Sequence, residues 1–393
     1  MIIKPRYRGF ICTTAHPVGC YKNVEDLVKK ASALNIVKDK RPKNVVVIGA
    51  SSGYGLASRV IASFAYGAKT IGVSFEKEGS KKHTATAGYY NNIAFDSLAE
   101  ENGIPTLTIH GDAFSNETKE EVIIACKEMF ENEKIDLLIY SLAAPTRTDP
   151  NTNTTYSSVI KPIGHDYHNK TVDFHSGEVS ETIITPASTQ EIEDTVKVMG
   201  GEDWQLWIER LLEADVLAND VTTIAYSYIG PSVTHPIYKD GTIGKAKDHL
   251  WDSCQPITDI LKPLQGKAYV SVNKALVTQA SSAIPVVPLY ISLLYKIMKE
   301  NGNHEGCFEQ IERLFKDYLY SSKADINIKD KRIRMDDYEM SDEVQAEVDR
   351  IWSTITTDTV DELTDIDGYR KEFFSLFGFG RDDVDYNEDI EKF

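Results

Sequence analysis

The chain has 393 residues, of which 41% are hydrophobic, as is usual for a globular protein with a large buried core. The formal net charge is −17, and residues 336–393 contribute −14 of it, because they hold 19 acidic and 5 basic residues. Phosphate binding requires clustered lysine and arginine, so the nearly neutral remainder argues against nucleic acid as a partner. We expect the acidic stretch to be a solvated surface.

Cysteine usage and hydropathy indicate the compartment. The five cysteines are scattered and include no CxxC pair, which is typical of a reducing compartment and of neither a disulfide framework nor a zinc site. The start, MIIKPRYRGF, lacks the apolar run of a signal peptide, and the most apolar run, 283–294, is too short to span a bilayer. We expect a cytoplasmic protein without membrane contacts. The histidines include no HxxxH pair, so we expect no metal.

The stretch NVVVIGASSGYGLASRV contains a pattern typical of nucleotide binding. The β-branched run 45–48 predicts a buried parallel strand, and a helix-compatible stretch, 56–66, follows it. Between them, Gly49, Gly53 and Gly55 allow the backbone to turn tightly and to approach a pyrophosphate at the helix N-terminus. A glycine pattern alone is weak evidence, but here strand, turn and helix come in the required order.

A second predicted strand, 70–75, ends at Glu76, which lies 21 residues after Gly55. A carboxylate at this place can accept hydrogen bonds from the ribose hydroxyls of NADH and would repel the 2′-phosphate of NADPH. We therefore expect NADH to be preferred. The neighbouring Lys77 weakens this argument, and Glu76 also fits an ordinary surface residue.

The alternation of strands and helices continues along the chain. Residues 106–114 predict a strand that ends at Asp112 and Ala113, which we expect beside the adenine. A predicted helix at about 117–130 leads to a further strand at 135–145, whose small final residues leave room for a cofactor. Strands that alternate with helices indicate an α/β fold with a doubly wound, Rossmann-like parallel sheet.

Two tyrosine–lysine pairs are candidates for proton delivery. Short-chain dehydrogenases combine a glycine turn with Tyr-x-x-x-Lys, and this spacing occurs at Tyr295 and Lys299, within an amphipathic helical run where packing explains both residues. Tyr238 follows a predicted strand at 222–231, and Lys247 lies in the first turns of a predicted helix. The spacing alone leaves open whether Tyr238 is catalytic or structural.

Several motifs together resemble the trans-2-enoyl-CoA reductase family, which includes the FabV-type enoyl-acyl-carrier-protein reductases. The resemblance runs from HPVGC (16–20) to RIRMDDYE (332–339) and includes GASSGYGLASR, YSLAAPTRTDP, KVMGGEDW, AYSYIGP and SVNKALVT. The family's mark is a catalytic tyrosine and lysine separated by eight residues. This spacing selects Tyr238 and Lys247.

The resemblance implies NADH-dependent reduction of the trans-2 double bond of an enoyl thioester, in fatty-acid biosynthesis or a butyrate-type fermentation. The substrate and partner is an enoyl-CoA or an enoyl-acyl carrier protein. Hydride adds at C3, and Tyr238 stabilises and protonates the enolate oxygen. Lys247 supplies a nearby positive charge and holds the nicotinamide ribose, while Tyr228 contacts the substrate. The implied cofactor-binding residues are Gly49, Ala50, Ser51, Ser52, Gly53, Tyr54, Gly55, Phe75, Glu76, Asp112, Ala113, Leu142, Ala143, Lys247, Leu276, Val277 and Thr278.

Other segments have less specific predictions. The apolar helix from residue 284 can wall an acyl chain or be ordinary core, and the tryptophans of GGEDWQLW are expected in the core. Lys239 and Lys245 are expected on the surface. The N-terminal segment and residues 326–335 predict small added β-hairpins, the second with its turn at Asp330 and Lys331.

We expect one domain over residues 1–393. Its expected parts are an N-terminal extension (1–40), a dinucleotide-binding half (44–150), a catalytic and acyl-pocket half (190–320) and an acidic C-terminal appendage (326–393). A monomer is expected, with a homodimer as the alternative. Two other functions stay open: a short-chain-type carbonyl or alcohol oxidoreductase that uses Tyr295 and Lys299, and a sensor that binds NADH without turnover.

Overall fold

The computed structural model describes residues 2–8, 11–36, 41–80, 83–131, 133–321 and 328–390. Within them a seven-stranded sheet has the order β13-β12-β11-β6-β3-β4-β5, and each neighbouring pair is parallel. Its strands are β3 (Asn44–Ile48), β4 (Lys69–Ser74), β5 (Thr106–His110), β6 (Ile135–Tyr140), β11 (Leu217–Ser227), β12 (Lys267–Val272) and β13 (Arg332–Arg334). The strand order reverses between β3 and β6, so the predicted doubly wound α/β fold is confirmed.

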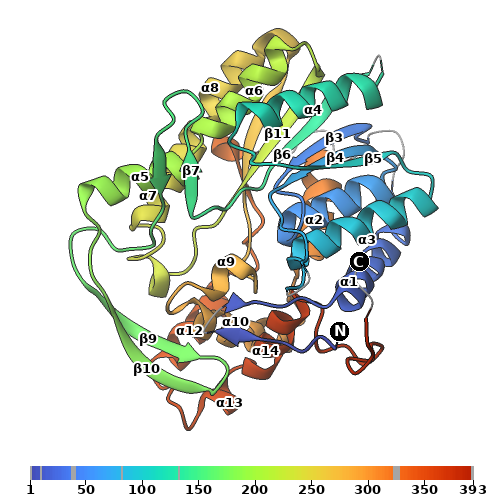
Figure 1. Cartoon of the computed structure of the whole chain (residues 1–393). Helices are drawn as coiled ribbons and strands as arrows, with labels where there is room; N and C mark the ends of the chain where they lie inside the picture. Colours follow the sequence, from blue (N-terminus) through green and yellow to red (C-terminus); the bar gives the residue numbers. More distant parts are fainter. Residues whose placement is uncertain are drawn as a thin grey trace.

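Helices cover both faces of this sheet (Figure 1). One face packs against α1 (Pro17–Ser32), α2 (Gly53–Val60), α3 (Ala87–Glu101) and α11 (Cys307–Arg313), and the other against α4 (Asn116–Met129), α6 (Glu202–Glu213) and α8 (Cys254–Leu261). Side chains of β3 alternate between the two faces, since Val45 and Val47 join the first core and Val46 and Ile48 the second. The tryptophans of α6 are fully buried, as expected.

A third cluster, which we call the α10 core, lies at the carboxyl ends of the strands. It surrounds α10 (Val287–Glu300) and includes residues that follow β11 and β12, such as Ile237 and Ala275. The antiparallel hairpin β9 (Tyr167–Asp173) and β10 (Glu178–Ile184) joins it, together with α12 (Asp342–Trp352) and α14 (Ile366–Ser375). Figure 1 shows these elements grouped below the sheet.

The C-terminal residues differ from the solvated appendage that the charge suggests. Val348 of α12 and Phe373 of α14 are fully buried in the α10 core, and the carboxylates of Asp336 and Glu339 are also 0% exposed. The expected solvent exposure is wrong for these residues. Apolar residues at helical spacing form a buried face, which the overall acidic composition does not reveal. The C-terminal segment is therefore part of the folded interior.

The two predicted hairpins have different outcomes. At the N-terminus, β1 (Tyr7–Arg8) pairs antiparallel with β2 (Ile11–Cys12), as expected. In the second, residues 326–327 lie outside the described residues, and Asp330 and Lys331 have the positive φ values of a turn, 52° and 59°. Of the described residues, 328–331 form no strand and β13 pairs parallel with β12 at the edge of the main sheet, so these residues do not form the expected hairpin. Burial of Ile333 in the core explains this pairing.

Helix boundaries differ modestly from the sequence prediction. The helix predicted at 56–66 is α2 continued by a π-helical turn at Ile61–Ala65. The apolar helix expected from residue 284 begins at Val287, because Val286 has a φ of 74° and Pro288 is accommodated only in the first turn. The remaining α-helices and β-strands of the described residues are β7 (Thr146–Thr148), β8 (Thr155–Ser157), α5 (Thr189–Met199), α7 (Thr242–Asp252), α9 (Gln279–Ser282) and α13 (Val360–Leu363). Among the described helices, none is long and apolar enough to cross a membrane.

Candidate active site

The glycine turn occupies the point where the strand order reverses. Gly49 and Gly53 have φ values of 87° and 54°. A Cβ atom on Gly55 would lie 1.8 Å from the carbonyl oxygen of Gly49, and one on Gly49 would lie 2.3 Å from that of Ser141, so both positions exclude side chains. No side chain caps the start of α2, which leaves its first N–H groups free for an anion. These residues fit a dinucleotide pyrophosphate.

Glu76 follows β4 and is anchored beside the glycine turn. Its two carboxylate oxygens accept hydrogen bonds from the hydroxyls of Ser51 and Thr86, each at 2.5 Å. A Cβ atom on Gly88 would lie 2.1 Å from Glu76 Oε1, so α3 approaches the carboxylate closely. The adjacent Phe75 is 77% exposed, which is unusual for a large apolar ring and leaves it free to pack on a base. Both residues therefore lie where the sequence predicts cofactor contacts.

Hydrogen bonds from α4 and α6 fix the loop after β5. The carbonyl oxygen of Ala113 accepts hydrogen bonds from Lys119 Nζ at 3.0 Å and from Trp207 Nε1 at 3.1 Å. Asp112 Oδ1 accepts from the backbone N–H of Phe114 at 3.0 Å. These bonds fix the backbone of the loop that carries Asp112 and Ala113.

The loop after β12 contacts the glycine turn. Tyr54 Oη donates to the carbonyl oxygen of Lys274 at 2.8 Å, immediately before the predicted cofactor residues Leu276, Val277 and Thr278. Leu276 and Val277 are each 5% exposed, and Thr278 caps α9. After β6, Leu142 is half-buried and Ala143 is exposed. The structure thus brings the loops after β3 and β12 together at one edge of the sheet.

The rival pair, Tyr295 and Lys299, lies in a packed setting. Tyr295 is 0% exposed; its hydroxyl donates to Glu372 at 2.8 Å and accepts from the N–H of Val277 at 3.1 Å. Lys299 Nζ donates to Asp365 at 2.7 Å. Both functional groups are engaged, and the tyrosine hydroxyl has no room for a substrate. This geometry disfavours the short-chain mechanism.

Tyr238 lies in the turn that leads into α7, next to the ring of Tyr228. The two rings are 4.9 Å apart between centroids and meet edge to face. Tyr228 Oη donates to Glu339 at 3.1 Å, whereas within the described chain the hydroxyl of Tyr238 has no hydrogen-bond partner. Burial raises the pKa of Tyr238 to about 12, so the phenol keeps its proton at neutral pH. Tyr238 is therefore a free donor in the candidate site.

Lys247 reaches back from α7 to the end of β11. Its Nζ donates to the carbonyl oxygen of Tyr226 at 3.3 Å, and burial lowers the pKa of Lys247 to about 8. The hydroxyl of Tyr226 in turn lies 2.6 Å from that of Ser58 on α2. Lys247 is thus anchored at the carboxyl end of β11, on a residue whose side chain reaches α2. Lys239 and Lys245 are exposed, as expected.

Sequence reasoning missed Glu339. It is one of 19 acidic residues in the C-terminal stretch, and its charge gives no sign that it is buried against Tyr228. Its position in RIRMDDYE, inside a motif used for the family resemblance, is the one signal that could have singled it out.

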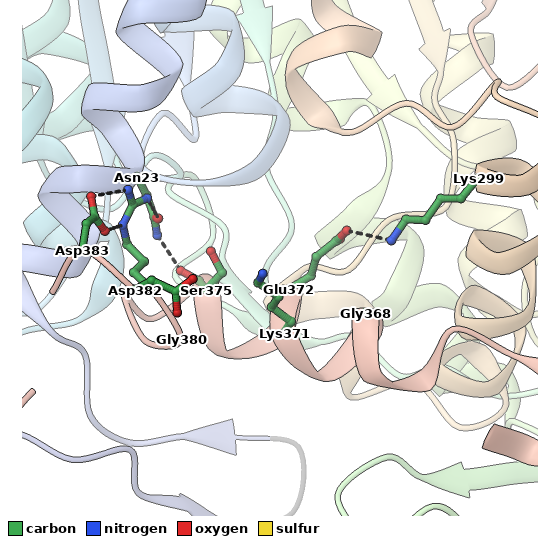
Figure 2. Close-up of a pocket in the computed structure, with 10 residues that line it drawn as sticks. Asn23, Lys299, Gly368, Lys371, Glu372, Ser375, Gly380, Asp382 and Asp383 are labelled. Carbon is green, nitrogen blue, oxygen red and sulfur yellow. Dashed lines mark hydrogen bonds and ion pairs between the residues drawn. The ribbon is translucent and has the colours of Figure 1, made fainter.

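A cavity of about 540 Å³ opens beside α14 (Figure 2). Figure 2 shows Glu372 directed toward Lys299, with 3.9 Å between carboxylate and ammonium. Its lining residues are Asn23, Lys299, Gly368, Lys371, Glu372, Ser375, Gly380, Arg381, Asp382 and Asp383. Tyr238, Lys247 and the predicted cofactor residues are not among them. Lys299 of the rival pair is, but its ammonium donates to Asp365, so this cavity is not the candidate active site.

Three family descriptions match consecutive parts of the chain. Residues 2–81 match "NAD(P)H binding domain of trans-2-enoyl-CoA reductase", residues 83–320 match "Trans-2-enoyl-CoA reductase catalytic region", and residues 329–390 match "Enoyl reductase FAD binding domain". Together these matches span most of the described sheet and the α10 core.

Individual relatives match along the full chain. The chain is 54% identical over 391 residues to the trans-2-enoyl-CoA reductase [NADH] of Clostridium perfringens, covering 100% of this chain and 99% of the relative. It is 55% identical over 393 residues to the enoyl-[acyl-carrier-protein] reductase [NADH] of Flavobacterium johnsoniae, with coverages of 100% and 98%. The crystal structure of Treponema denticola trans-2-enoyl-CoA reductase in complex with NAD superposes with a TM-score of 0.95 at 47% identity, covering 100% of this chain and 99% of that one.

The description of residues 329–390 mentions FAD, and the described residues of this segment do not fit a flavin. Ligand sites for large planar rings are lined mainly by apolar and aromatic side chains. The cavity at this segment is lined by charged and small residues, while Tyr369 and Phe373 are fully buried in the α10 core. We therefore assign no flavin to this segment, which completes the sheet edge and the α10 core.

Proposed function

The chain belongs to the trans-2-enoyl-CoA reductase family, and from this premise we propose that it reduces the trans-2 double bond of enoyl thioesters with NADH. The observation that carries the proposal is the free hydroxyl of Tyr238, beside Tyr228 and at the same sheet edge as the glycine turn. A protonated phenol there matches a reaction in which negative charge develops on a carbonyl oxygen.

The cofactor is held by groups that the fold has already positioned. The N–H groups at the start of α2 bind the pyrophosphate, and Glu76 accepts hydrogen bonds from the adenosine ribose. When bound, NADH supplies hydride to C3 of the substrate. The anchoring of Glu76 by Ser51 and Thr86 fixes the negative charge that would repel a 2′-phosphate. The preference for NADH over NADPH is therefore part of the proposal.

The chain's own proton chemistry centres on Tyr238. Its hydroxyl donates a hydrogen bond to the thioester oxygen and then the proton that the enolate requires. Lys247, as an ammonium, stabilises the phenolate left behind and contacts the nicotinamide ribose. Tyr228 contacts the substrate from the other side. Because Lys247 has a pKa of about 8, its side chain is an ammonium in most molecules at neutral pH.

The carrier of the acyl group is open between coenzyme A and acyl carrier protein. The relative from Clostridium perfringens is named for coenzyme A and the one from Flavobacterium johnsoniae for acyl carrier protein. Their identities to this chain, 54% and 55%, are nearly equal, so sequence identity does not decide between the two carriers. NADH oxidation should be measured with C4 and C12 enoyl-CoA and then with enoyl-acyl carrier protein. The proposed function fails if NADH binds but none of these thioesters is reduced, as a nucleotide sensor would behave.

We also propose a cytoplasmic monomer that works as one domain, with a homodimer as the alternative. All five cysteines are free thiols, which is compatible with a reducing compartment. The shared α10 core, to which residues from the N-terminal, central and C-terminal parts contribute, supports a single folding unit.

A further inference from the structure

One buried carboxylate joins three segments at the candidate site. Glu339 is 0% exposed, and its Oε1 accepts hydrogen bonds from Tyr228 Oη at 3.1 Å and from Tyr290 Oη at 2.7 Å. Its Oε2 accepts from the backbone N–H of Ala275 at 2.7 Å. The carboxylate is thus fully engaged by donors that come from three different parts of the chain.

Each of these donors belongs to a different wall of the proposed site. Tyr228 follows β11 and stands against Tyr238, Tyr290 lies on the α10 helix, and Ala275 directly precedes the loop proposed to hold the nicotinamide. Oε1 thus serves the two tyrosines, while Oε2 serves the cofactor loop.

We propose that Glu339 is a positioning residue for the reduction: it fixes Tyr228 with its hydroxyl proton turned away from the reacting oxygen, so that Tyr238 is the phenol that donates. The inference rests on the proposed function, because it assigns separate tasks to the two tyrosines of that site. An ionised carboxylate only accepts hydrogen bonds, and a phenol has a single proton to give. Tyr228 therefore offers only a lone pair toward the substrate.

A second contact restricts Tyr228 from the backbone side. Gly230 has a φ of 79°, and a Cβ atom there would lie 2.9 Å from Tyr228 Oη. The hydroxyl is thus confined between the Cα of Gly230 and the carboxylate of Glu339. Since the rings of Tyr228 and Tyr238 touch, holding the first also holds the orientation of the second.

The surroundings of Glu339 allow its ionised form. Burial raises the pKa of Glu339, while the positive charge of Lys274 and the hydrogen bonds from Ala275 and Tyr290 act in the opposite direction. Lys274 is itself 2% exposed and donates from Nζ to the carbonyl oxygen of Ala275 at 3.0 Å. Burial is the larger influence on this pKa, and it is the geometry that supports the ionised form: the three groups that contact the carboxylate, Tyr228, Tyr290 and the N–H of Ala275, are all placed as donors to it.

The test compares Glu339→Gln with and without the hydroxyl of Tyr228, by NADH oxidation with crotonyl-CoA. A glutamine amide group in place of Oε1 donates instead of accepting, so the proton of Tyr228 is released toward the cleft. We expect Glu339→Gln to lower kcat by about tenfold with little change in KM for NADH. In the Tyr228→Phe background the same substitution should change kcat by less than about threefold, because the hydroxyl that Glu339 positions is absent.

Matched control variants distinguish this positioning role from a general loss of folding or stability. Asp336→Asn alters another fully buried acid of the same segment, which pairs with Arg334, and should leave kcat within about threefold. Thermal unfolding of each variant reports folding. If Glu339→Gln does not fold, Glu339→Asp keeps the charge but withdraws the carboxylate by one methylene and should show the same dependence on Tyr228.

Two outcomes would overturn the proposal. One is an unchanged kcat in Glu339→Gln; the other is an equal loss with and without the Tyr228 hydroxyl, which would mean that Glu339 only supports the fold. Failure of the parent enzyme to reduce crotonyl-CoA or longer enoyl thioesters is a separate result, which would contradict the proposed function itself.

Discussion

Tyr238 meets Tyr228 edge to face, with the ring planes at 83°, yet among the described residues only the Tyr228 hydroxyl has a hydrogen-bond partner, Glu339. Such an aromatic contact contributes about 0.5–1.5 kcal/mol beyond the area it buries, so the pair is a stable unit. The difference between the two phenols comes from their partners, because Tyr228 donates to Glu339 and Tyr238 has no partner in the described chain. Two chemically identical side chains therefore have different tasks in the proposed reaction.

Cofactor choice depends on Glu76. We expect the parent to use NADH well ahead of NADPH, and Glu76→Ala to narrow the difference in kcat/KM without abolishing turnover, because it removes the charge that repels the 2′-phosphate. Thr86→Val is the control: it removes one of the two anchoring hydroxyls and keeps the charge, so the preference should persist. Equal kcat/KM of the parent for both cofactors would remove this role from Glu76.

Chain-length preference should depend on one face of α10. Val287 lies three residues before Tyr290 and shares its helix face, which is directed at Glu339 and Tyr228. We expect Val287→Phe to reduce kcat/KM for C12 enoyl-CoA more than for C4. Leu289→Phe, on another face of the same buried helix, should reduce both equally and lower the unfolding temperature, because it overpacks the core. A uniform loss in Val287→Phe would assign that residue to plain core as well.

Local pattern was enough to predict the glycine turn and the strands β3, β4, β5, β6 and β11 of the central sheet, but not β12 or the place of β13. The β-branched run of β3, the glycines after it and the strand–helix alternation are all short-range signals. The spacing of Tyr238 and Lys247 was informative only together with the family resemblance. The glycine turn and the Tyr238–Lys247 spacing are each contained within about twenty positions, which is why a local pattern can reveal them.

Contacts between distant segments could not be predicted in this way. Glu339 is separated from Tyr228 by 111 residues, and an acid in an acidic stretch has no periodicity that marks it as buried. The position of β13 could not be predicted either, because a three-residue strand is placed by the distant sheet edge that it joins. The packing of Tyr295, by contrast, was expected from its place in a helical run, and only its partners Glu372 and Val277, which are distant in sequence or belong to another loop, could not be foreseen.

The activity should fall at alkaline pH because of Lys247. Its pKa of about 8 lies below the ordinary lysine value, so the ammonium is present below pH 8 and is lost as the pH rises through it. We expect kcat/KM to decline above about pH 8, while Tyr238, with a pKa of about 12, stays protonated over this range. Lys247→Arg should move the decline to higher pH, since arginine keeps its charge. A flat profile up to pH 9.5 would contradict the assignment.

The eight-residue spacing is tested most directly by removing the Tyr238 hydroxyl. Tyr238→Phe keeps the ring and its contact with Tyr228, so folding and NADH binding should survive, while kcat should fall by about 10²-fold or more. Lys247→Ala should lower kcat and also weaken NADH binding, because its ammonium serves both. Binding measured by fluorescence titration and kcat measured with crotonyl-CoA separate the two effects.

The two residues should also act as a unit. If Lys247 works by stabilising the phenolate of Tyr238, the double variant should be far less impaired than the product of the two single losses. Tyr295→Phe and Lys245→Ala are the controls, because Tyr295 is buried with its hydroxyl engaged and Lys245 is exposed, and both should keep kcat within a few-fold of the parent. A parental rate in Tyr238→Phe together with a large loss in Tyr295→Phe would reverse the assignment, since the proton would then have to come from the pair with the three-residue spacing.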